Sequence, residues 1–268
     1  MAGDPAARAL AEGRVLVEAL LDAGVYDHPT HDIHLVETHC AWVILTGDFV
    51  YKLKKPVNFG FLDYSTLEKR RFYCEEEVRL NRRFAPELYL GVVRITGKRR
   101  RPRIDSAGAL LDYAVRMRQF PEGGLLSELA ASGQLQEAHI DQLIECIAAF
   151  HRRAAVAGAD SDYGEPQQVW HWISENFRHI RPALDSREEI DRLQQVERWA
   201  EQRRGALEAL LQRRKREGFI RECHGDLHLG NITLIDGRVT PFDCIEFNPG
   251  LRWIDVFSEV AFLLMDLD

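Results

Sequence analysis

Hydrophobic and polar positions follow the period of β-strands in the first part of the chain. A β-hairpin is predicted by HLVETHCAWVIL and FVYKLKKPV, which are rich in β-branched and aromatic residues and flank the turn signal TGD. Two more strands are predicted by LGVVRIT and ALLDYAVRMRQF, on either side of the basic turn GKRRRPRIDSAG. One helix precedes the hairpin, and another is predicted over STLEKRRFYCEEEVRLNRRF, where Ser65 and Glu68 form a capping box.

Beyond the break FPEGG at residues 120–124, the pattern becomes that of long helices. Two helices are predicted by IDQLIECIAAFHRRAAVAG and by SREEIDRLQQVERWAEQRRGALEALLQRRKREG, the second ending in basic residues and Gly218. A short hairpin is predicted by NITLIDGRVTPFD, which carries the turn signal Asp236-Gly237. We therefore predict an α+β protein of two lobes, a small antiparallel sheet with a helix over residues 1–120 and a mainly helical lobe over residues 121–268.

Composition indicates the compartment. The chain has 268 residues, of which 46% are hydrophobic and 29% charged, as in ordinary globular proteins. No run approaches the roughly 20 apolar residues that span a bilayer, and the charged N-terminal segment does not have the pattern of a signal peptide. The five cysteines are far apart and form no CxxC pair, which favours reduced thiols. We predict a cytoplasmic protein with no membrane contact.

Charge is distributed unevenly between the two predicted lobes. The formal net charge of -7 argues against a nucleic-acid partner. Residues 1–120 hold 19 Lys and Arg against 16 Asp and Glu, whereas residues 121–268 hold 16 against 26. This asymmetry suits an anionic ligand on the first lobe and a cationic ligand on the second; ordinary variation over solvated faces is the alternative.

The stretch CHGDLHLGN gathers polar side chains that suit phosphoryl transfer. Asp226 and Asn231 are five residues apart, as are the catalytic aspartate and the metal-binding asparagine of kinase-type sites. Asp243 follows on the next hairpin, twelve residues after Asn231. Because Mg²⁺ prefers hard oxygen ligands, Asn231 and Asp243 are its candidate ligands and Asp226 is the candidate catalytic base. Taken singly, such residues are more often local capping groups.

A lysine for the phosphates is predicted in FVYKLKK. Alternation along a strand places Val50 and Lys52 on one face and Tyr51 and Leu53 on the other, so we choose Lys52 over the two lysines that follow it. An acid on the following helix should pair with this lysine. The three candidates are Glu75, Glu76 and Glu77. Glu77 is favoured, and Glu76 is the second choice.

Together, CHGDLHLGN, FDCIEF and RWIDVFSEVAF resemble the aminoglycoside phosphotransferase family, whose fold is similar to that of protein kinases. The family's loop reads HGDxxxxN and is matched from His224 to Asn231. The resemblance implies that Asp226 is the catalytic base, that Asn231 and Asp243 bind Mg²⁺, and that Asp255 is the structural aspartate that closes the motif. His224 is expected to brace the loop.

The resemblance also implies contacts with the nucleotide. Kinase-like folds hold adenine by backbone groups where the chain leaves the sheet for the second lobe, which points to Arg118 and Phe120 here; a simple edge strand is the alternative. No Gly-rich loop lies between the first strands, so ETHC would approach the phosphates through Thr38 and His39. His151, in AAFHRR, is expected to be a packed helix histidine bonded to the catalytic loop.

More narrowly, residues 37–90 resemble an uncharacterised bacterial branch of this family, whose members are often joined to a C-terminal P-loop kinase-like domain. No GxxxxGK[ST] loop occurs in this chain, so any such partner domain would belong to a longer natural chain. The sequence stops at FLLMDLD, inside an expected helix, where the family usually continues with further helices. We therefore expect the sequence to be a fragment.

These features predict a phosphotransferase that uses ATP and Mg²⁺, with GTP left open. Its acceptor would be a hydroxyl of a small polar molecule, including amine-bearing ones such as aminoglycosides or amino sugars. The alternative is a catalytically weak nucleotide-binding regulatory module that works with a P-loop kinase-like partner domain. A protein kinase is disfavoured, because no APE-type segment or activation loop lies between Asp243 and Asp255.

Overall fold

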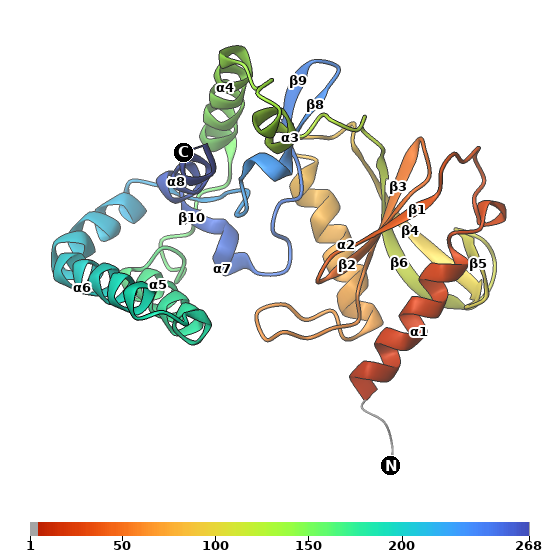
Figure 1. The fold of residues 1–268 in the computed structure, drawn as a ribbon, viewed down its shortest axis with the longest axis horizontal. Helices are drawn as coiled ribbons and strands as arrows, with labels where there is room; N and C mark the ends of the chain where they lie inside the picture. The colour runs from red at the N-terminus through yellow and green to blue at the C-terminus, as the bar shows by residue number, and fades with distance from the viewer. Residues whose placement is uncertain (1–4, 268) are drawn as a thin grey trace.

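A six-stranded antiparallel sheet forms the first lobe, as the strand patterns predict (Figure 1). In the computed structural model, which describes residues 5–267, the strand order is β1-β2-β3-β6-β4-β5. The strands are β1 (His34–Glu37), β2 (Ala41–Leu45), β3 (Phe49–Lys54), β4 (Tyr89–Lys98), β5 (Arg101–Ile104) and β6 (Leu110–Arg118). β3 and β6 are central, so the predicted phosphate lysine lies on an inner strand.

Two helices cover the two faces of this sheet, α1 (Pro5–Ala19) and α2 (Leu67–Asn81). Tyr51 and Leu53 of β3 pack in the core that includes α1, whereas Val50 packs in the core that includes α2. The predicted alternation along β3 is therefore confirmed. Lys52 shares a face with Val50 and therefore faces α2, the helix that carries the three candidate acids.

The structure differs from the predicted elements at three positions, two in turns and one at the start of a helix. The first predicted strand is divided into β1 and β2, because the chain turns where the Thr38 hydroxyl accepts a hydrogen bond from the Ala41 N–H at 3.0 Å. The basic turn contains β5, which pairs with β4. The capping prediction was wrong by one residue, because Thr66 accepts from the N–H of Lys69 while Ser65 bonds to Asp63 instead.

The second lobe is mainly helical, as predicted. Its helices are α3 (Leu126–Ala131), α4 (Glu137–Arg153), α5 (Pro166–Ile180), α6 (Arg187–Arg216), α7 (Pro249–Arg252) and α8 (Val256–Leu267). Two short antiparallel pairs accompany them, β7 (Ile220–Glu222) with β10 (Trp253–Asp255) and β8 (Ile232–Ile235) with β9 (Arg238–Pro241). Single 3₁₀ turns lie at η1 (Ala23–Val25) in the first lobe and at η2 (Arg181–Ala183) and η3 (Leu229–Asn231) in the second. The predicted tight hairpin is confirmed, whereas α3, α5 and α7 were not predicted.

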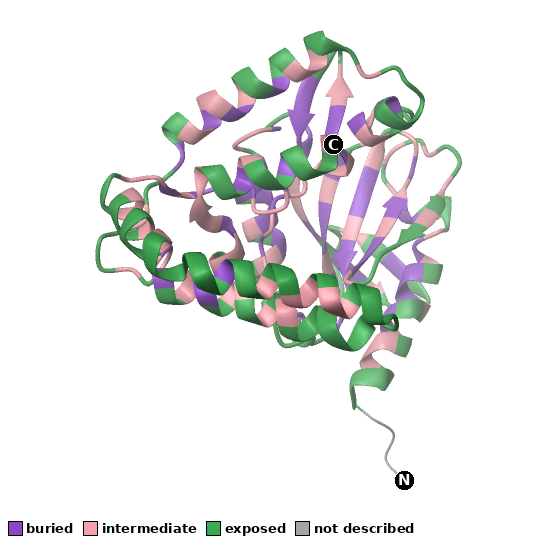
Figure 2. Ribbon diagram, turned by 60° about the vertical axis from the view of Figure 1, so that its left-hand side comes forward, coloured by how far each residue is buried: buried purple, intermediate pink, exposed green. Residues whose placement is uncertain are grey.

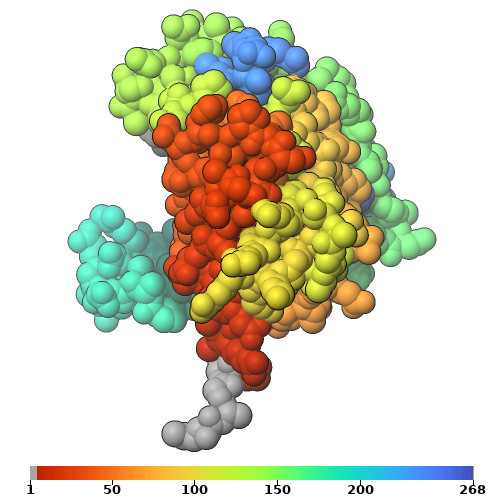
Figure 3. Space-filling view, turned by 90° about the vertical axis from the view of Figure 1, so that its right-hand side faces the viewer, coloured from red at the N-terminus to blue at the C-terminus, as the bar shows by residue number. Residues whose placement is uncertain are grey.

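The α5–α6 pair is the least buried part of the second lobe. Figure 2 shows mostly exposed and intermediate residues along α6, of which Ala200 is the buried one. In Figure 3 the segment around the α5–α6 turn, in teal, stands out beside the sheet lobe. Among residues 5–267, no helix has the length and apolar character needed to cross a membrane. The exact division at residues 120 and 121 stays a prediction, with β6 ending before it and α3 beginning after it.

Candidate active site

The predicted catalytic loop runs from the end of β7 to the start of β8, and alternate residues anchor it. Leu227 and Leu229 are buried in the core of the second lobe, which turns Asp226 and His228 outward. Gly225 has a φ of +89°, and a Cβ on it would lie 2.9 Å from the carbonyl oxygen of Leu251. This position therefore needs glycine, both for its backbone conformation and for the close approach of the chain.

Gly225→Ala is expected to destabilise the protein by about 1–3 kcal/mol or more, because it adds a backbone clash to a left-handed φ. Urea unfolding followed by circular dichroism measures the loss. The matched control is Gly237→Ala, at a φ of +75° but with nothing within 4 Å of the added Cβ, for which about 1 kcal/mol is expected. Equal losses at the two positions would show that the clash with the Leu251 backbone is not significant.

His224 links the catalytic loop to the hairpin that leads to Asp243. Its ring is fully buried; Nδ1 accepts from the backbone N–H of Asp226 at 3.3 Å, and Nε2 donates to the carbonyl oxygen of Phe242 at 2.8 Å. This pair of bonds requires a neutral imidazole protonated at Nε2. Burial lowers the pKa of His224, although the Glu259 carboxylate opposes this. The geometry is that of a bracing residue, the role predicted for it.

Stability should fall as the pH is lowered below about 6.5, the ordinary pKa of histidine. The unfolded chain then takes up a proton at this position, whereas the folded state, with its lowered pKa, does not; the unfolded state binds more protons and is favoured. The effect is up to about 1.4 kcal/mol per pH unit until the folded pKa is reached. Urea unfolding between pH about 7 and about 5 checks it. His224→Gln should give a shallower slope, and an unchanged slope would contradict the prediction.

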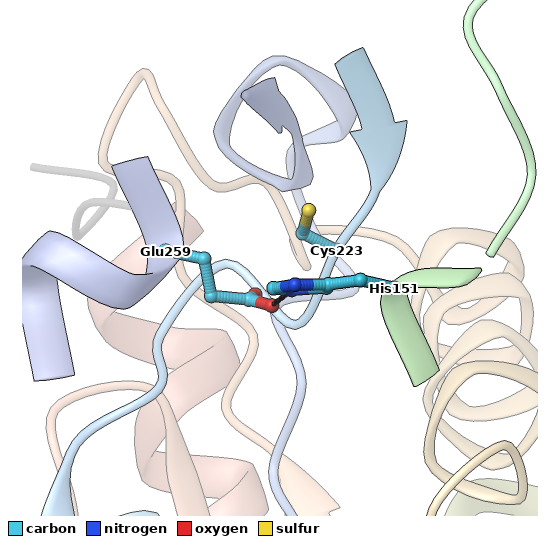
Figure 4. A group of neighbouring side chains, drawn as sticks. All are labelled: His151, Cys223 and Glu259. Carbon is cyan, nitrogen blue, oxygen red and sulfur yellow. Dashed lines mark hydrogen bonds and ion pairs between the residues drawn. The ribbon is translucent and has the colours of Figure 1, made fainter. Parts of the chain in front are cut away.

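The brace beneath the loop is Glu259 of α8. Its Oε1 accepts from the backbone N–H of His224 at 2.5 Å and of Gly225 at 3.0 Å, and its Oε2 lies 2.6 Å from Nε2 of His151 on α4 (Figure 4). Burial would raise the pKa of Glu259, but the bonds from His151 and the loop outweigh it and lower the pKa. The expected bond between His151 and the loop is therefore indirect, through this carboxylate.

His151, Cys223 and Glu259 also form a candidate metal cluster, with ligand atoms within 4.8 Å of one another. Their existing bonds argue against a metal. Both carboxylate oxygens are already used by the loop and the histidine, and burial raises the pKa of Cys223, whose thiol donates to the carbonyl oxygen of Ile254 at 3.6 Å. A thiol must lose its proton to bind a metal, so this cluster is a structural brace.

Asp255 has its hydrogen-bond partners outside the catalytic loop. Its carboxylate accepts two hydrogen bonds from the Arg214 guanidinium of α6, at 2.5 and 2.8 Å, and caps the N–H of Phe257. It therefore ties α6 to the start of α8 and does not touch the catalytic loop. The residue that contacts the loop is Glu259, four residues further along the chain on α8, whereas Asp255 belongs to β10 and bonds Arg214 and the N–H of Phe257.

Asp226 and Asn231 face one another across the loop. The Asn231 Nδ2 amide donates to the Asp226 carboxylate and to its backbone carbonyl, both at 3.0 Å. The side chain of Asp226 is 40% exposed, so an acceptor from solvent can reach it. His228 lies beside the same carboxylate, with Nε2 3.6 Å from Oδ2. The spacing of five residues thus produces one polar cluster, and the amide orients the carboxylate.

Lys52 brings the sheet lobe to this cluster. Its Nζ lies 2.9 Å from Oε1 of Glu77 and also contacts Oδ1 of Asp243. Burial of the Lys52 ammonium would lower its pKa, but the two carboxylates outweigh it, and the pKa lies well above its ordinary value. Lys52 is therefore charged and joins β3, α2 and the end of the β8–β9 hairpin.

Among the three candidate acids of α2, Glu77 is the one that turns inward. Glu75 pairs with Arg71 on the exposed side of the helix. Glu76 is 19% exposed and pairs with Arg79 and with Arg252 of the second lobe, whereas the Glu77 side chain is 0% exposed. The favoured partner of the lysine is thus the observed one. Burial would raise the pKa of Glu77, but the neighbouring lysine ammonium groups lower it.

Asp243 is held in an unusual backbone conformation, with a φ of +65°. Its N–H donates to the hydroxyl of Tyr89 at 3.1 Å, and the next N–H, of Cys244, donates to Oδ1 of Asn81 at 2.9 Å. β4 and α2 therefore set the direction of the Asp243 side chain. The backbone N–H of Phe242 also donates to the Asn231 carbonyl at 2.9 Å, which ties the hairpin to the catalytic loop.

The donor set fits Mg²⁺. The Asn231 Nδ2 atom is used by Asp226, so its Oδ1 is the amide atom available for a cation, and Asp243 adds a carboxylate that is 37% exposed. One carboxylate and one carboxamide, with phosphate oxygens and waters, match the hard and partly hydrated environment that Mg²⁺ prefers. Asn231 and Asp243 are the residues that would hold it.

The residues predicted to contact the adenine and the phosphates do not all lie at the site. The N–H of Arg118 donates to the carbonyl of Leu88 at 2.9 Å, so this N–H is occupied by the sheet. The ring of Phe120 packs 5.2 Å from that of Phe242, beside Asp243, and is close to the site. Thr38 bonds within its own turn, and its carbonyl accepts from a buried lysine.

His39 is exposed in the same turn and lies in none of the contacts described for the site. Apart from this turn, the Arg118 backbone and Asp255, the predicted residues meet in one place. Contacts with a nucleotide stay predictions for Thr38, His39, Arg118 and Phe120.

Sequence reasoning missed two residues beside Lys52. Lys54 lies on the same face of β3 and reaches the same Glu77, at 2.7 Å from Oε2. Glu246, from the segment after Asp243, contacts both Lys54 and the hydroxyl of Tyr64. The period of two along β3 was the signal for Lys54, since residues 52 and 54 must share a face. The position of Glu246, three residues after Asp243, suggested a side chain that faces the acceptor; the structure instead pairs it with Lys54 and Tyr64.

The fold and this site define a kinase-like phosphotransferase architecture. Residues 73–266, well over half of the chain, match the Phosphotransferase enzyme family (APH). The chain belongs to this family, and the predicted α+β kinase-like fold is confirmed.

Three uncharacterised proteins are similar over most of the chain, among them Mb2027c of Mycobacterium bovis and Rv2004c of Mycobacterium tuberculosis. Each is 34% identical over 247 residues, which are 91% of this chain and 47% of the relative. The chain thus spans about half the length of the curated relatives it matches. The narrower branch with a P-loop partner domain stays a prediction.

Proposed function

We propose that the chain transfers the γ-phosphate of ATP to a hydroxyl group of a small polar molecule. The observation that carries this proposal is the position of Lys52, which contacts Glu77 of α2 and Asp243 of the second lobe at once. The N–H of Phe242, the residue before Asp243, donates to the carbonyl of Asn231, the residue that orients Asp226. Membership of a phosphotransferase family supports the same conclusion.

Each residue has a physical task in this proposal. Lys52 exchanges Asp243 for the phosphate oxygens, and Glu77 keeps the ammonium in place because its carboxylate is buried and cannot be displaced by water. Asn231 and Asp243 hold Mg²⁺, which when bound neutralises charge on the phosphate oxygens. Asp226 receives the proton of the acceptor hydroxyl, a contribution of about 10²- to 10⁴-fold in rate.

The acceptor is proposed from charge alone. Residues 121–268, which carry the catalytic loop, hold 26 Asp and Glu against 16 Lys and Arg. Such a lobe attracts cationic molecules over a distance of about a Debye length. Amine-bearing alcohols, such as amino sugars and aminoglycosides, are therefore the first acceptors to test, with neutral sugars as the comparison.

Release of ADP tests the proposal, measured with Mg²⁺ and ATP over a panel of aminoglycosides, amino sugars, neutral sugars and amino alcohols. An acceptor-dependent rate that disappears on chelation of Mg²⁺ is expected, and mass spectrometry should find one added phosphate on the acceptor. Bound Mg-ATP with no transfer to any acceptor would instead support the alternative, a regulatory module that works with a P-loop kinase-like partner domain.

A further inference from the structure

A second lysine, Lys54, is buried beside the proposed phosphate lysine. Its side chain is 2% exposed, and its Nζ lies 2.7 Å from Oε2 of Glu77 and contacts Oε1 of Glu246. Since the proposed mechanism assigns one cation to the phosphates, Lys54 is a buried charge without a task. Buried charges are costly unless their partners compensate them, so two carboxylates around Lys54 call for an explanation.

Lys54 fixes the carboxylate that orients Lys52. The two oxygens of Glu77 are divided between the lysines, with Oε1 at 2.9 Å from Lys52 and Oε2 at 2.7 Å from Lys54. A carboxylate held at both oxygens cannot rotate without breaking a buried ion pair. The position of the Lys52 ammonium therefore depends on Lys54 through a shared partner.

Lys54 also joins the two lobes, in parallel with Lys52. Glu246 follows Asp243 by three residues in the second lobe, so Lys52–Asp243 and Lys54–Glu246 are adjacent ion pairs between β3 and one segment. They differ in exposure, because Asp243 is 37% exposed and Glu246 is 6% exposed. In the proposed function the outer pair would open when Asp243 holds a metal, whereas the inner pair, shielded from water, would stay closed.

We propose that Lys54 is a positioning residue for the nucleotide: through Glu77 and Glu246 it keeps β3 in place while Lys52 leaves Asp243 for the phosphates. Tyr64 supports this arrangement, since its hydroxyl donates to Glu246 and its ring lies 4.8 Å from the Lys54 ammonium. The inference rests on the proposed function, in which Lys52 binds the phosphates.

The test removes the inner pair without leaving a lone charge. Lys54→Met alone would leave Glu246 buried without its cation, so the principal variant is Lys54→Met with Glu246→Gln, whose amide oxygen still accepts from Tyr64. Its melting temperature should be within about 5 °C of wild type, because neutral replacements of buried ion pairs are often tolerated. Isothermal titration with Mg²⁺ and AMP-PNP should nevertheless show a Kd about tenfold higher.

A mutant cycle separates positioning from mere stability. If Lys54 acts through Lys52, the variant that combines all three substitutions should bind AMP-PNP no more weakly than Lys52→Met alone, so that the two effects do not add. The matched control makes the same replacements in a remote ion pair, Lys215→Met with Glu165→Gln, which lie 2.5 Å apart on α6 and before α5. The control should change the melting temperature and leave the Kd within about twofold of wild type.

Two outcomes would overturn the inference alone: a wild-type Kd in the paired variant, or full additivity with Lys52→Met. If the paired variant does not fold, the Kd of the single variant Glu246→Gln for AMP-PNP tests the inference instead. This variant keeps Lys54 on Glu77 and should still raise the Kd severalfold, by weakening the inner contact between the lobes; an unchanged Kd overturns the inference. Absence of Mg-AMP-PNP binding by the wild-type chain would overturn the proposed function, and the inference with it.

Discussion

Asp226→Asn is expected to lower the rate of phosphate transfer by about 10²- to 10⁴-fold while leaving the affinity for Mg-nucleotide within about threefold. The carboxamide oxygen can still accept the hydrogen bond from Asn231 Nδ2, which is 3.0 Å from the carboxylate now. The loop therefore keeps its shape, and the change removes the basic oxygen alone. A loss confined to turnover is the signature of a group that acts on the acceptor proton.

The measurement is the rate of acceptor-dependent ADP release, with the nucleotide Kd determined by titration on the same samples. Asp236→Asn, in the exposed turn between β8 and β9, is the matched control and should leave both quantities unchanged. A variant at Asp226 that transfers phosphate at the wild-type rate would falsify its role as the base. A parallel loss of rate and affinity would move its role to nucleotide binding.

Residues close in the sequence were predicted well because the local chain decides where they lie. Asp226 and Asn231 are five residues apart, and the structure joins them directly by a hydrogen bond. The position of Asp243 followed from the short hairpin, whose turn signal at Asp236 is confirmed by a φ of +49°. The face on which each β3 side chain lies followed from the alternating pattern, because Tyr51 packs in one hydrophobic core and Val50 in the other.

Partners distant in the sequence could not be predicted, because tertiary packing selects them from equivalent residues. Asp255 and Glu259 are both acids near the start of one helix, and only the three-dimensional path of β10 decides that Glu259 contacts the catalytic loop. The sequence placed Glu246 near the site, but its partner Lys54 lies 192 residues away along the chain and was not predicted. Sequence motifs thus locate the reacting groups better than the residues that hold them.

The backbone groups available for the nucleotide could not be predicted from the sequence either. Backbone N–H groups near Arg118 were expected to be free for adenine, since the chain leaves the sheet there. The register of the sheet instead places the N–H of Arg118 on Leu88, and that of Gln119 on Asp48. Hydrogen-bond register depends on all neighbouring strands, so a single strand's pattern does not determine which groups stay available.

Asp243→Asn is expected to lower phosphate transfer at least about 100-fold and to abolish the gain in nucleotide affinity that Mg²⁺ provides. The replacement removes the charged ligand that the metal needs, and it also removes one of the two carboxylates on Lys52. The backbone should tolerate it, because asparagine accepts the left-handed conformation, here a φ of +65°, as readily as aspartate does. Glu77 still pairs with Lys52, so the fold should persist.

Nucleotide titrations with and without Mg²⁺ measure this effect, and Asp236→Asn is again the control, since Asp236 also has a positive φ, of +49°. Both substitutions place asparagine at a positive φ, and Asp243→Asn alone removes a candidate metal ligand and a partner of Lys52. In the absence of Mg²⁺, loss of the Lys52–Asp243 pair should free the ammonium for the phosphates, so metal-free nucleotide should bind the Asp243 variant at least as well as wild type. Undiminished Mg²⁺ dependence in that variant would instead mean that the metal is held without this carboxylate, and that the ion pair with Lys52 is its main role.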